Sequence, residues 1–150
     1  MLNRIKSRVI LYADDDPEDR MLAQDAFEDS RIKGELRFVN DGEELLAYLH
    51  RKPPFVNPRE FPLPQLILLD LNMPRKDGRE VLKEIKTHQN LRHIPIIILT
   101  TSRAEEDIAR TYGLGGNSFI TKPVTYDGLV TIMKTLAHYW LDMVEPPPMA

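Results

Sequence analysis

The sequence predicts an α/β domain in which helices cover both faces of a five-stranded parallel sheet. The strongest observation is the run Leu66–Leu69, four apolar residues without alternation, because a strand buried on both faces needs no polar side. Ile96–Leu99 is a second run of this kind. Expected strands and helices then alternate along the chain, five of each, which favours right-handed crossovers and a single sheet.

The first elements are predicted by composition and by a helix start signal. Arg8–Ala13 is a short, β-rich run that indicates a buried strand. Pro17 directly behind Asp16 marks the start of a helix, which is expected to extend to Ser30. Glu35–Asn40 alternates apolar and polar residues, so this strand is expected nearer an edge of the sheet.

The remaining elements continue the alternation. They are a helix capped by Asp41 and ending near Lys52, the central strand Leu66–Leu69, a helix from Arg79 to about His88, the strand Ile96–Leu99, a helix over Arg103–Leu114, a short strand over Asn117–Thr121 and a long helix from Thr125 to about Val144. The connection Pro53–Pro64 holds five of the twelve prolines, so it is neither helix nor central strand. We expect one domain over 1–150, with its core over about 7–138 and an extended C-terminal helix and proline-rich tail over 139–150.

Composition excludes several classes of protein. A chain of 150 residues is long enough for one domain with a real core. A net charge of −3 argues against a nucleic-acid partner. There are no cysteines, and therefore no disulfide and no sulfur-ligated metal. The sequence shows neither a signal-peptide core nor the roughly 18 apolar residues of a membrane span, so we expect a cytoplasmic protein without a membrane partner.

Polar side chains follow the ends of the expected strands. In chain order they are Asp14 and Asp15, then Asp70, Thr100 and Lys122. Because the carboxyl ends of parallel strands share one edge of a sheet, where ligands bind, these five residues are expected to meet there. The sequence thus predicts three carboxylates, a hydroxyl and an ammonium group in one place.

Three carboxylates in one small site require a cation or bound protons. Two unit charges about 4 Å apart repel by roughly 4 kcal/mol at an effective dielectric near 20. An all-oxygen ligand set favours Mg²⁺, which also binds phosphate oxygens. These residues therefore indicate a site that accepts a phosphoryl group. Asp70, at the end of the central strand, is the expected nucleophile, and Lys122 and Thr100 are the expected contacts for the phosphoryl oxygens.

Four motifs, in this order and spacing, resemble the receiver domain of bacterial two-component response regulators. They are DDD at Asp14–Asp16, LLDLNMPRKDG at Leu68–Gly78, IILTTS at Ile97–Ser102 and FITKP at Phe119–Pro123. The resemblance extends from about residue 7 to 138. It implies a flavodoxin-like, doubly wound (βα)5 fold with strand order 2-1-3-4-5. It also implies that Asp70 receives a phosphoryl group from the phosphohistidine of a sensor histidine kinase.

The resemblance assigns roles to the remaining site residues. The implied ligands of Mg²⁺, for which Mn²⁺ can substitute, are Asp15, Asp70 and the backbone carbonyl of Asn72, with Asp14 acting through water. Thr100 and Lys122 would contact the phosphoryl oxygens. The Lys122–Pro123 peptide would be cis, as is usual in the family.

Two positions depart from the common pattern of the family. The switch residue that couples to Thr100 is Phe119 here, where many members have tyrosine. Phenylalanine has no hydroxyl to leave unsatisfied, so our hypothesis is an inward Phe119 and a subdued switch. Thr101 occupies a position where alanine or glycine is common. Our second hypothesis is that its side chain hinders water and lengthens the life of the phosphoryl form.

The C-terminal part indicates a narrower resemblance and a partner surface. The proline-rich segment, the KDGREVL stretch and the tail near Trp140 are similar to single-domain response regulators paired with cyanobacterial phytochromes. The last helix carries two apolar stripes, of which only one is needed to cover the sheet. The surplus one predicts a homodimer through the fourth helix, fifth strand and fifth helix. Its expected contacts are Val130, Ala137, Trp140 and Leu141.

Two other functions use similar chemistry. A Mg²⁺-dependent phosphohydrolase of the haloacid dehalogenase type also has a nucleophilic aspartate, but it needs an acid two residues later, where this chain has Asn72. A nucleotide-binding module needs a glycine-rich loop after the first strand, where this chain has acids. We therefore expect a signalling protein rather than an enzyme, with self-phosphorylation and self-dephosphorylation as its only chemistry.

Overall fold

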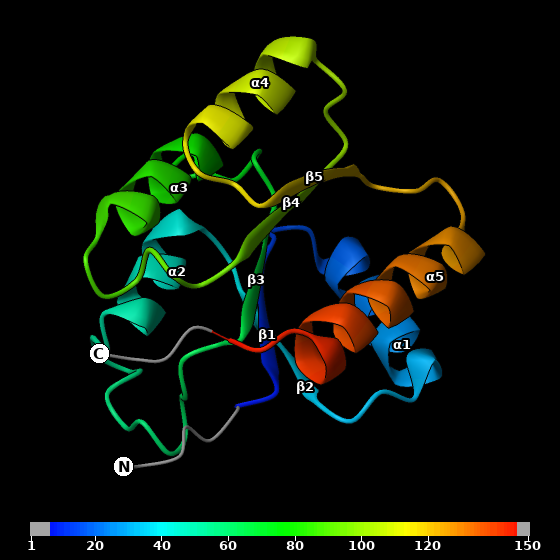
Figure 1. Ribbon diagram of the computed structural model, residues 1–150, viewed down its shortest axis with the longest axis horizontal. Coiled ribbons are helices and arrows are strands. Elements are labelled where there is room, and N and C mark those ends of the chain that lie inside the picture. The colour runs from blue at the N-terminus through cyan, green and yellow to red at the C-terminus, as the bar shows by residue number, and fades with distance from the viewer. Residues whose placement is uncertain (1–6, 147–150) are drawn as a thin grey trace.

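Five parallel strands form one sheet in the order β2-β1-β3-β4-β5, which confirms the predicted fold (Figure 1). The structure is a computed structural model and describes residues 7–146. In chain order the elements are β1 (Val9–Ala13), α1 (Pro17–Ser30), β2 (Glu35–Val39), α2 (Gly42–Leu49), β3 (Leu66–Leu69), α3 (Gly78–Thr87), β4 (Ile96–Thr100), α4 (Glu105–Gly113), β5 (Ser118–Thr121), α5 (Tyr126–Ala137) and the π-helix η1 (His138–Met143). The end of the expected proline-rich tail, 147–150, lies outside the described residues.

The three central strands carry the core. Every residue of β1, β3 and β4 is buried, as the unbroken apolar runs predict. β2 and β5 form the two edges, and both are partly exposed. The edge position expected for the second strand is therefore confirmed.

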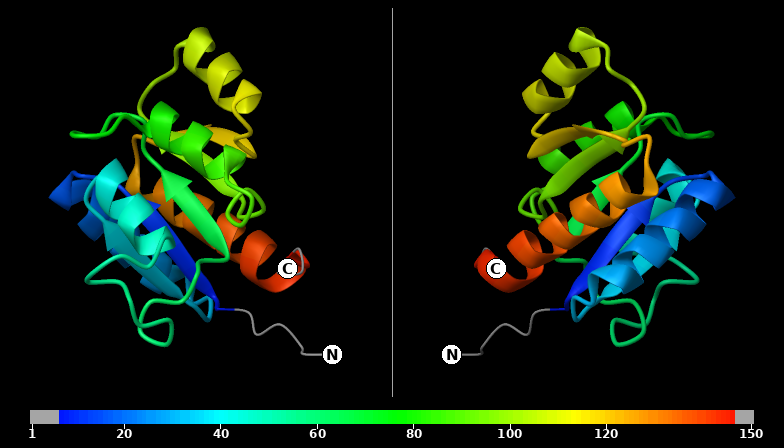
Figure 2. Two further views of the ribbon diagram at one scale, coloured as in Figure 1. Left: turned by 90° about the vertical axis from the view of Figure 1, so that its left-hand side faces the viewer. Right: turned by 90° about the vertical axis from the view of Figure 1, so that its right-hand side faces the viewer.

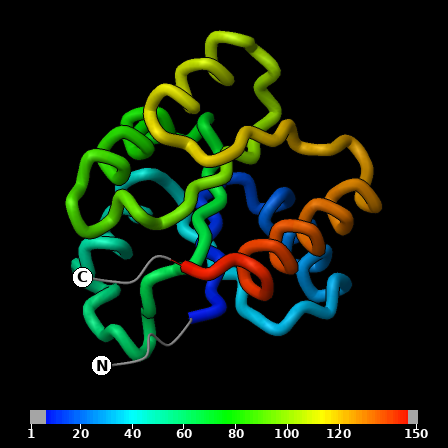
Figure 3. The backbone as a smooth tube through the Cα atoms, viewed as in Figure 1, coloured from blue at the N-terminus to red at the C-terminus, as the bar shows by residue number. Residues whose placement is uncertain are grey.

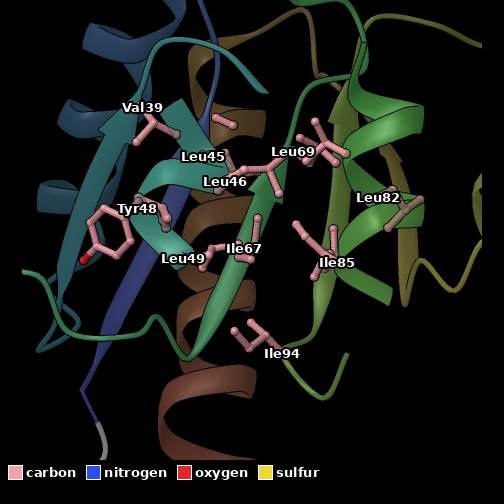
Figure 4. Packing of buried hydrophobic residues seen from close by; sticks show 14 of the residues in the cluster. Val39, Leu45, Leu46, Tyr48, Leu49, Ile67, Leu69, Leu82, Ile85 and Ile94 are labelled. Atoms are coloured by element: carbon pink, nitrogen blue, oxygen red, sulfur yellow. The ribbon is translucent and has the colours of Figure 1, made fainter. Parts of the chain in front are cut away.

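Helices cover both faces of the sheet (Figure 2). α1 and α5 pack on one face through a cluster that includes Phe27 and Met133, while α2 and α3 pack on the other through a cluster that includes Leu46 and Leu82. Figure 4 shows this second cluster, in which Leu45 and Leu49 of α2 and Ile85 of α3 point toward the central strand. Within the described residues, none of the helices has the length and apolar character that a membrane span requires.

Aspartate side chains begin the helices where the sequence predicts them. Asp16 caps α1 and Asp41 caps α2, each accepting a hydrogen bond from a backbone N–H of the first turn. α2 ends at Leu49, a few residues earlier than expected. The reason is local, because Arg51 has a φ of 55°, in the left-handed region, and turns the chain out of the helix.

The proline-rich connection is packed against the domain. Phe55 and Phe61 lie against Tyr48 of α2, with ring centroids 5.2 and 5.8 Å from the Tyr48 ring. The Tyr48 hydroxyl donates a 2.8 Å hydrogen bond to the carbonyl of Pro62. These contacts extend the core cluster on the α2 face, and the Pro53–Pro54 peptide within the connection is cis.

The C-terminal end corrects the expected interface. Ala137 and Leu141 are fully buried in the core and cannot contact a second molecule, whereas Val130 and Trp140 are half-buried. The two stripes merge because the chain changes from α5 into the wider π turn of η1, which rotates Leu141 inward. η1 lies where β1 and β3 begin (Figure 3), and the Arg8 guanidinium donates a 3.2 Å hydrogen bond to the Leu141 carbonyl.

We predict that Gly78→Ala lowers the free energy of unfolding by about 1–3 kcal/mol, the usual cost of overpacking. A Cβ at Gly78 would lie 2.7 Å from the carbonyl oxygen of Asp70 and 2.8 Å from Cα of Leu71, and backbone atoms cannot move aside cheaply. Gly113→Ala in α4 is the control, because its Cβ would meet no atom within 4 Å. Urea unfolding measures both, and equal stability of the two variants would contradict the prediction.

Candidate functional site

The structure brings the five predicted site residues together at one edge of the sheet. Asp14 and Asp15 follow β1, Asp70 follows β3, Thr100 ends β4 and Lys122 follows β5. Because all strands are parallel, their carboxyl ends reach the same edge (Figure 1), and the loops there carry the polar side chains. The expected juxtaposition is therefore present.

Three carboxylates form a candidate metal centre. One oxygen from each of Asp14, Asp15 and Asp70 lies within 4.8 Å of the other two. Asp14 is 0% and Asp70 7% exposed, whereas Asp15 faces solvent. The set fits a hard divalent cation, since it offers only oxygen ligands and leaves an open side for water. No other group of this kind occurs in residues 7–146.

Lys122 offsets one of the negative charges of this cluster. Its Nζ lies 2.8 Å from Oδ2 of Asp14, 2.8 Å from Oδ2 of Asp19 and 3.2 Å from Oδ2 of Asp70. Burial opposes the charged amine, but the hydrogen bonds to Asp14 and Asp19 and the charge of Asp70 outweigh it and raise the pKa of Lys122. Because the amine is easier to protonate in the folded state, its charge stabilises the fold. This contribution is complete at a pH below about 10.4, the ordinary pKa of lysine, and is lost as the pH rises through the pKa of Lys122 in the folded protein.

Asp70 is held by donors from strand β4 and from the loop after β3. Thr100 Oγ1 donates a 2.9 Å hydrogen bond to Oδ1 of Asp70, and the backbone N–H of Asn72 donates to the same oxygen at 3.2 Å. Lys122 contacts the other oxygen. The carboxylate is thus fixed in orientation at the solvent edge, with a hydroxyl and an amine beside it. Metal binding by the carbonyl of Asn72 stays a prediction.

Asp19 and Tyr12 belong to the site although the sequence analysis missed them. Asp19, in the first turn of α1, points its carboxylate at Lys122. Burial and then the charge of Asp14 raise the pKa of Tyr12 well above its usual value, so its hydroxyl stays neutral. A signal for Asp19 was available, since the first turn of a helix that follows β1 lies over the carboxyl edge of the sheet.

The expected cis peptide at Lys122–Pro123 is wrong, because the only cis bond in the described residues joins Pro53 and Pro54. Trans is the more stable form of an X–Pro bond by about 0.5–1 kcal/mol. The Lys122 amine reaches all three of its carboxylate partners from the trans backbone, so nothing in the ion-pair geometry requires the cis form.

The two positions that depart from the common pattern lie on either side of the site. Phe119 is half-buried and packs against the core cluster on the α3 face, while its backbone N–H donates a 3.2 Å hydrogen bond to the Tyr112 hydroxyl. Thr101 is exposed and lines a cavity of about 220 Å³ between α1 and the loop after β5. Lys122 forms part of the same cavity wall, so the cavity borders the candidate site.

The family model for the response regulator receiver domain matches residues 10–134 of this chain. The fold and the carboxylate–lysine site agree with that match, and the chain belongs to this family. Proteins of this family work in phosphorelay signalling, in which the receiver accepts a phosphoryl group from a histidine kinase.

Relatives with known names include phytochrome response regulators. Response regulator Rcp1 from Synechocystis sp. is 39% identical over 140 residues, which are 93% of each chain. The crystal structure of its Mn²⁺-bound form has a TM-score of 0.82 and 38% identity, covering 93% of this chain and 99% of that one. The phosphorylated cyanobacterial phytochrome response regulator RcpA has a TM-score of 0.85 and 40% identity, covering 93% and 98%. The Mn²⁺-bound relative and the acidic cluster of this chain support divalent-metal binding.

We predict that Lys122→Met, measured without divalent ions, lowers the free energy of unfolding by about 3 kcal/mol, because the buried Asp14 and Asp70 lose their counter-ion. Excess Mg²⁺ should recover part of this loss by binding the same carboxylates. Lys134→Met, at an exposed position of α5, controls for the lost charge. Equal unfolding curves for Lys122→Met and wild type, in chelator and in Mg²⁺, would refute the prediction.

Proposed function

We propose that this protein accepts a phosphoryl group on Asp70 from a sensor histidine kinase and passes the signal on through the state of that residue. The observation that carries the proposal is the placement of Lys122 Nζ and Thr100 Oγ1 on the two oxygens of Asp70, 3.2 and 2.9 Å away, beside two further carboxylates. The carboxylates by themselves would repel an incoming phosphate, and Lys122, together with a cation bound by the carboxylates, would offset that repulsion.

The transfer itself needs little covalent chemistry from the protein. A carboxylate oxygen of Asp70 attacks phosphorus, an O–P bond forms as the P–N bond of the phosphohistidine breaks, and the bonding pair stays on the imidazole nitrogen. Lys122 and Thr100 are placed to hold phosphoryl oxygens by charge and by hydrogen bond. The buried Asp14 keeps Lys122 directed at the site.

The proposed metal is Mg²⁺, with Mn²⁺ able to replace it. Asp15, Asp70 and the backbone carbonyl of Asn72 would hold it, with Asp14 acting through water, and when bound it supplies positive charge to the phosphoryl oxygens. The choice of Mg²⁺ is supported by the all-oxygen ligand set and the open, exposed side at Asp15. The Mn²⁺-bound relative supports a divalent ion of this kind.

The proposed kinase partner is a phytochrome, and the proposed location is the cytoplasm, as expected from the sequence. Support for the partner comes from RcpA and from the bacteriophytochrome response regulator RtBRR, which is 38% identical with a TM-score of 0.73. A homodimer through α4, β5 and α5 remains part of the proposal. Its support is the partly exposed edge strand β5 with the half-buried Val130 and Trp140, without the buried Ala137 and Leu141.

The phosphohydrolase alternative is not favoured. At the position of the required second acid, Asn72 has an amide side chain, which cannot transfer a proton in that role. The proposal is therefore a signalling protein without multiple turnover, whose only reactions are its own phosphorylation and dephosphorylation. The experiment that tests phosphorylation also tests this distinction.

We predict that incubation with acetyl phosphate and Mg²⁺ adds a single phosphoryl group, visible in the intact mass, and that chelator abolishes the addition. Asp70→Asn should give no adduct, because the amide is not a nucleophile. Asp25→Asn, at an exposed position of α1, should be phosphorylated like wild type. An adduct that persists in Asp70→Asn would refute the assignment, and continuous hydrolysis of a generic phosphate ester would favour the phosphohydrolase.

We predict that Thr101→Ala shortens the half-life of the phosphoryl form by a few-fold. The exposed Thr101 side chain lies beside Lys122 on the cavity wall, where it hinders water from approaching the phosphoryl group. The half-life is measured by the loss of the mass adduct after the donor is removed. Thr135→Ala, on the exposed side of α5, is the matched control. An unchanged half-life in Thr101→Ala would show that the side chain does not hinder water.

A further inference from the structure

A second polar bridge joins the start of α3, the loop after β4 and the start of α4, outside the candidate metal centre. Arg79 of α3 donates hydrogen bonds of 2.6 and 2.8 Å to Oδ1 of Asp107 in α4. The other oxygen of Asp107 accepts a 2.7 Å hydrogen bond from the Ser102 hydroxyl. Arg79 also contacts Asp77, the cap of α3, at 3.0 Å. The bridge thus connects the start of α3, the loop before α4 and α4 itself.

The bridge is well shielded. The side chains of Arg79 and Asp107 are 16% and 18% exposed, so water screens this ion pair less than a surface pair. The hydrogen bond from Ser102, and then that from Arg79, lower the pKa of Asp107, which therefore stays ionised at neutral pH. The pair is a fixed feature of the fold under ordinary conditions.

Few other contacts hold the start of α4. Thr111 is the only buried residue of this helix, and Ala104 at its N-cap makes no side-chain hydrogen bond. The other helices of the sheet layers each bury three or more residues. The position of the α4 start therefore depends on Arg79 and Ser102 more than on apolar packing.

The bridge is connected to Asp70 through short stretches of backbone on both sides. Thr100, the last residue of β4, donates its hydrogen bond to Asp70, and Ser102, two residues later in the loop that follows, donates to Asp107. At the other end, α3 begins at Gly78, whose N–H donates a 3.2 Å hydrogen bond to the carbonyl of Leu71, next to Asp70. The two loops are thus joined twice, once at the carboxylate and once at Arg79.

We infer that Arg79, Asp107 and Ser102 form a latch that holds Thr100 and the start of α4 in the resting position, and that phosphorylation of Asp70 works against this latch. The inference rests on the proposed function. A phosphoryl oxygen lies farther from the strand than Oδ1 does, so Thr100 can follow it only if the loop shifts. Ser102 shifts with the loop, and its contact with Asp107 is strained. Arg79 is thereby a positioning residue for the phosphoacceptor.

The latch makes a prediction opposite in sign to that of a merely structural ion pair. A contact present only in the resting state opposes binding of the phosphoryl group, so its removal tightens binding by the coupling factor. Beryllium trifluoride with saturating Mg²⁺ serves as the probe, and calorimetry gives its dissociation constant. We expect Asp107→Ala to bind about fivefold tighter or more, the lower end of typical couplings between sites.

Matched variants separate the latch from general effects on α4. Glu106→Ala removes an equal charge from the same first turn, is exposed, and should bind beryllium trifluoride like wild type. Arg79→Gln should also tighten binding, and the double variant should bind no tighter than Asp107→Ala, because the contact between Arg79 and Asp107 is already absent there. Ser102→Ala should tighten binding by a smaller factor. Hydrogen exchange of the amides of 101–108 should speed up in Asp107→Ala and not in Glu106→Ala.

The outcomes are distinguishable. Thermal unfolding checks that Asp107→Ala is folded. If this variant binds the probe no tighter than wild type, the latch is overturned. The proposed function still stands in that case, provided that wild type binds the probe and forms the Asp70 adduct. Gains that add in the double variant would also overturn the latch. Failure of wild type to bind the probe and to form the adduct would overturn the proposed function and the latch together.

Discussion

The interaction on which the rest of the structure depends is the ion pairing between one amine and the carboxylates at the carboxyl edge of the sheet. Asp14 is completely buried, and a buried charge without a partner costs several kcal/mol, so the cluster is tolerated only because Lys122 reaches it from the end of the edge strand β5. The same contact ties β5 and the start of α1, through Asp19, to the central strands. Because these carboxylates need positive charge nearby, they can also bind a metal ion, and the metal ion together with Lys122 can attract a phosphate.

The fold and the core of the site could be predicted from the sequence because both follow from the apolar strands and their parallel order. Leu66–Leu69 and Ile96–Leu99 indicate fully buried strands, and parallel strands place whatever follows them at one edge. The topology of the sheet therefore places Asp70 and Thr100 at one edge, whereas the 2.9 Å hydrogen bond between them is a finding of the structure. Helix caps such as Asp16 are equally local and were equally predictable.

What could not be predicted depends on geometry between elements or on the course of the backbone. The sequence places Arg79 and Asp107 on different helices, and nothing in their spacing shows that the two helix starts meet. The cis form of Lys122–Pro123 was inferred from family resemblance, and a small energy difference between isomers left that inference without physical support. The stripe that contains Leu141 was misassigned because helical periodicity assumes 3.6 residues per turn, and the π turn of η1 changes that spacing.

The burial of Leu141 has a consequence for where this domain ends. Its side chain lies so close to Gly34 that a Cβ there would be 2.9 Å from Leu141 Cδ1, and its carbonyl accepts a hydrogen bond from Arg8. The stretch matched by the family model stops at residue 134, before this contact is made. A chain truncated at residue 134 would lack Leu141, which packs in the core cluster on the α1 face. The folded domain therefore extends at least through η1, and a fusion to another protein should be joined after η1.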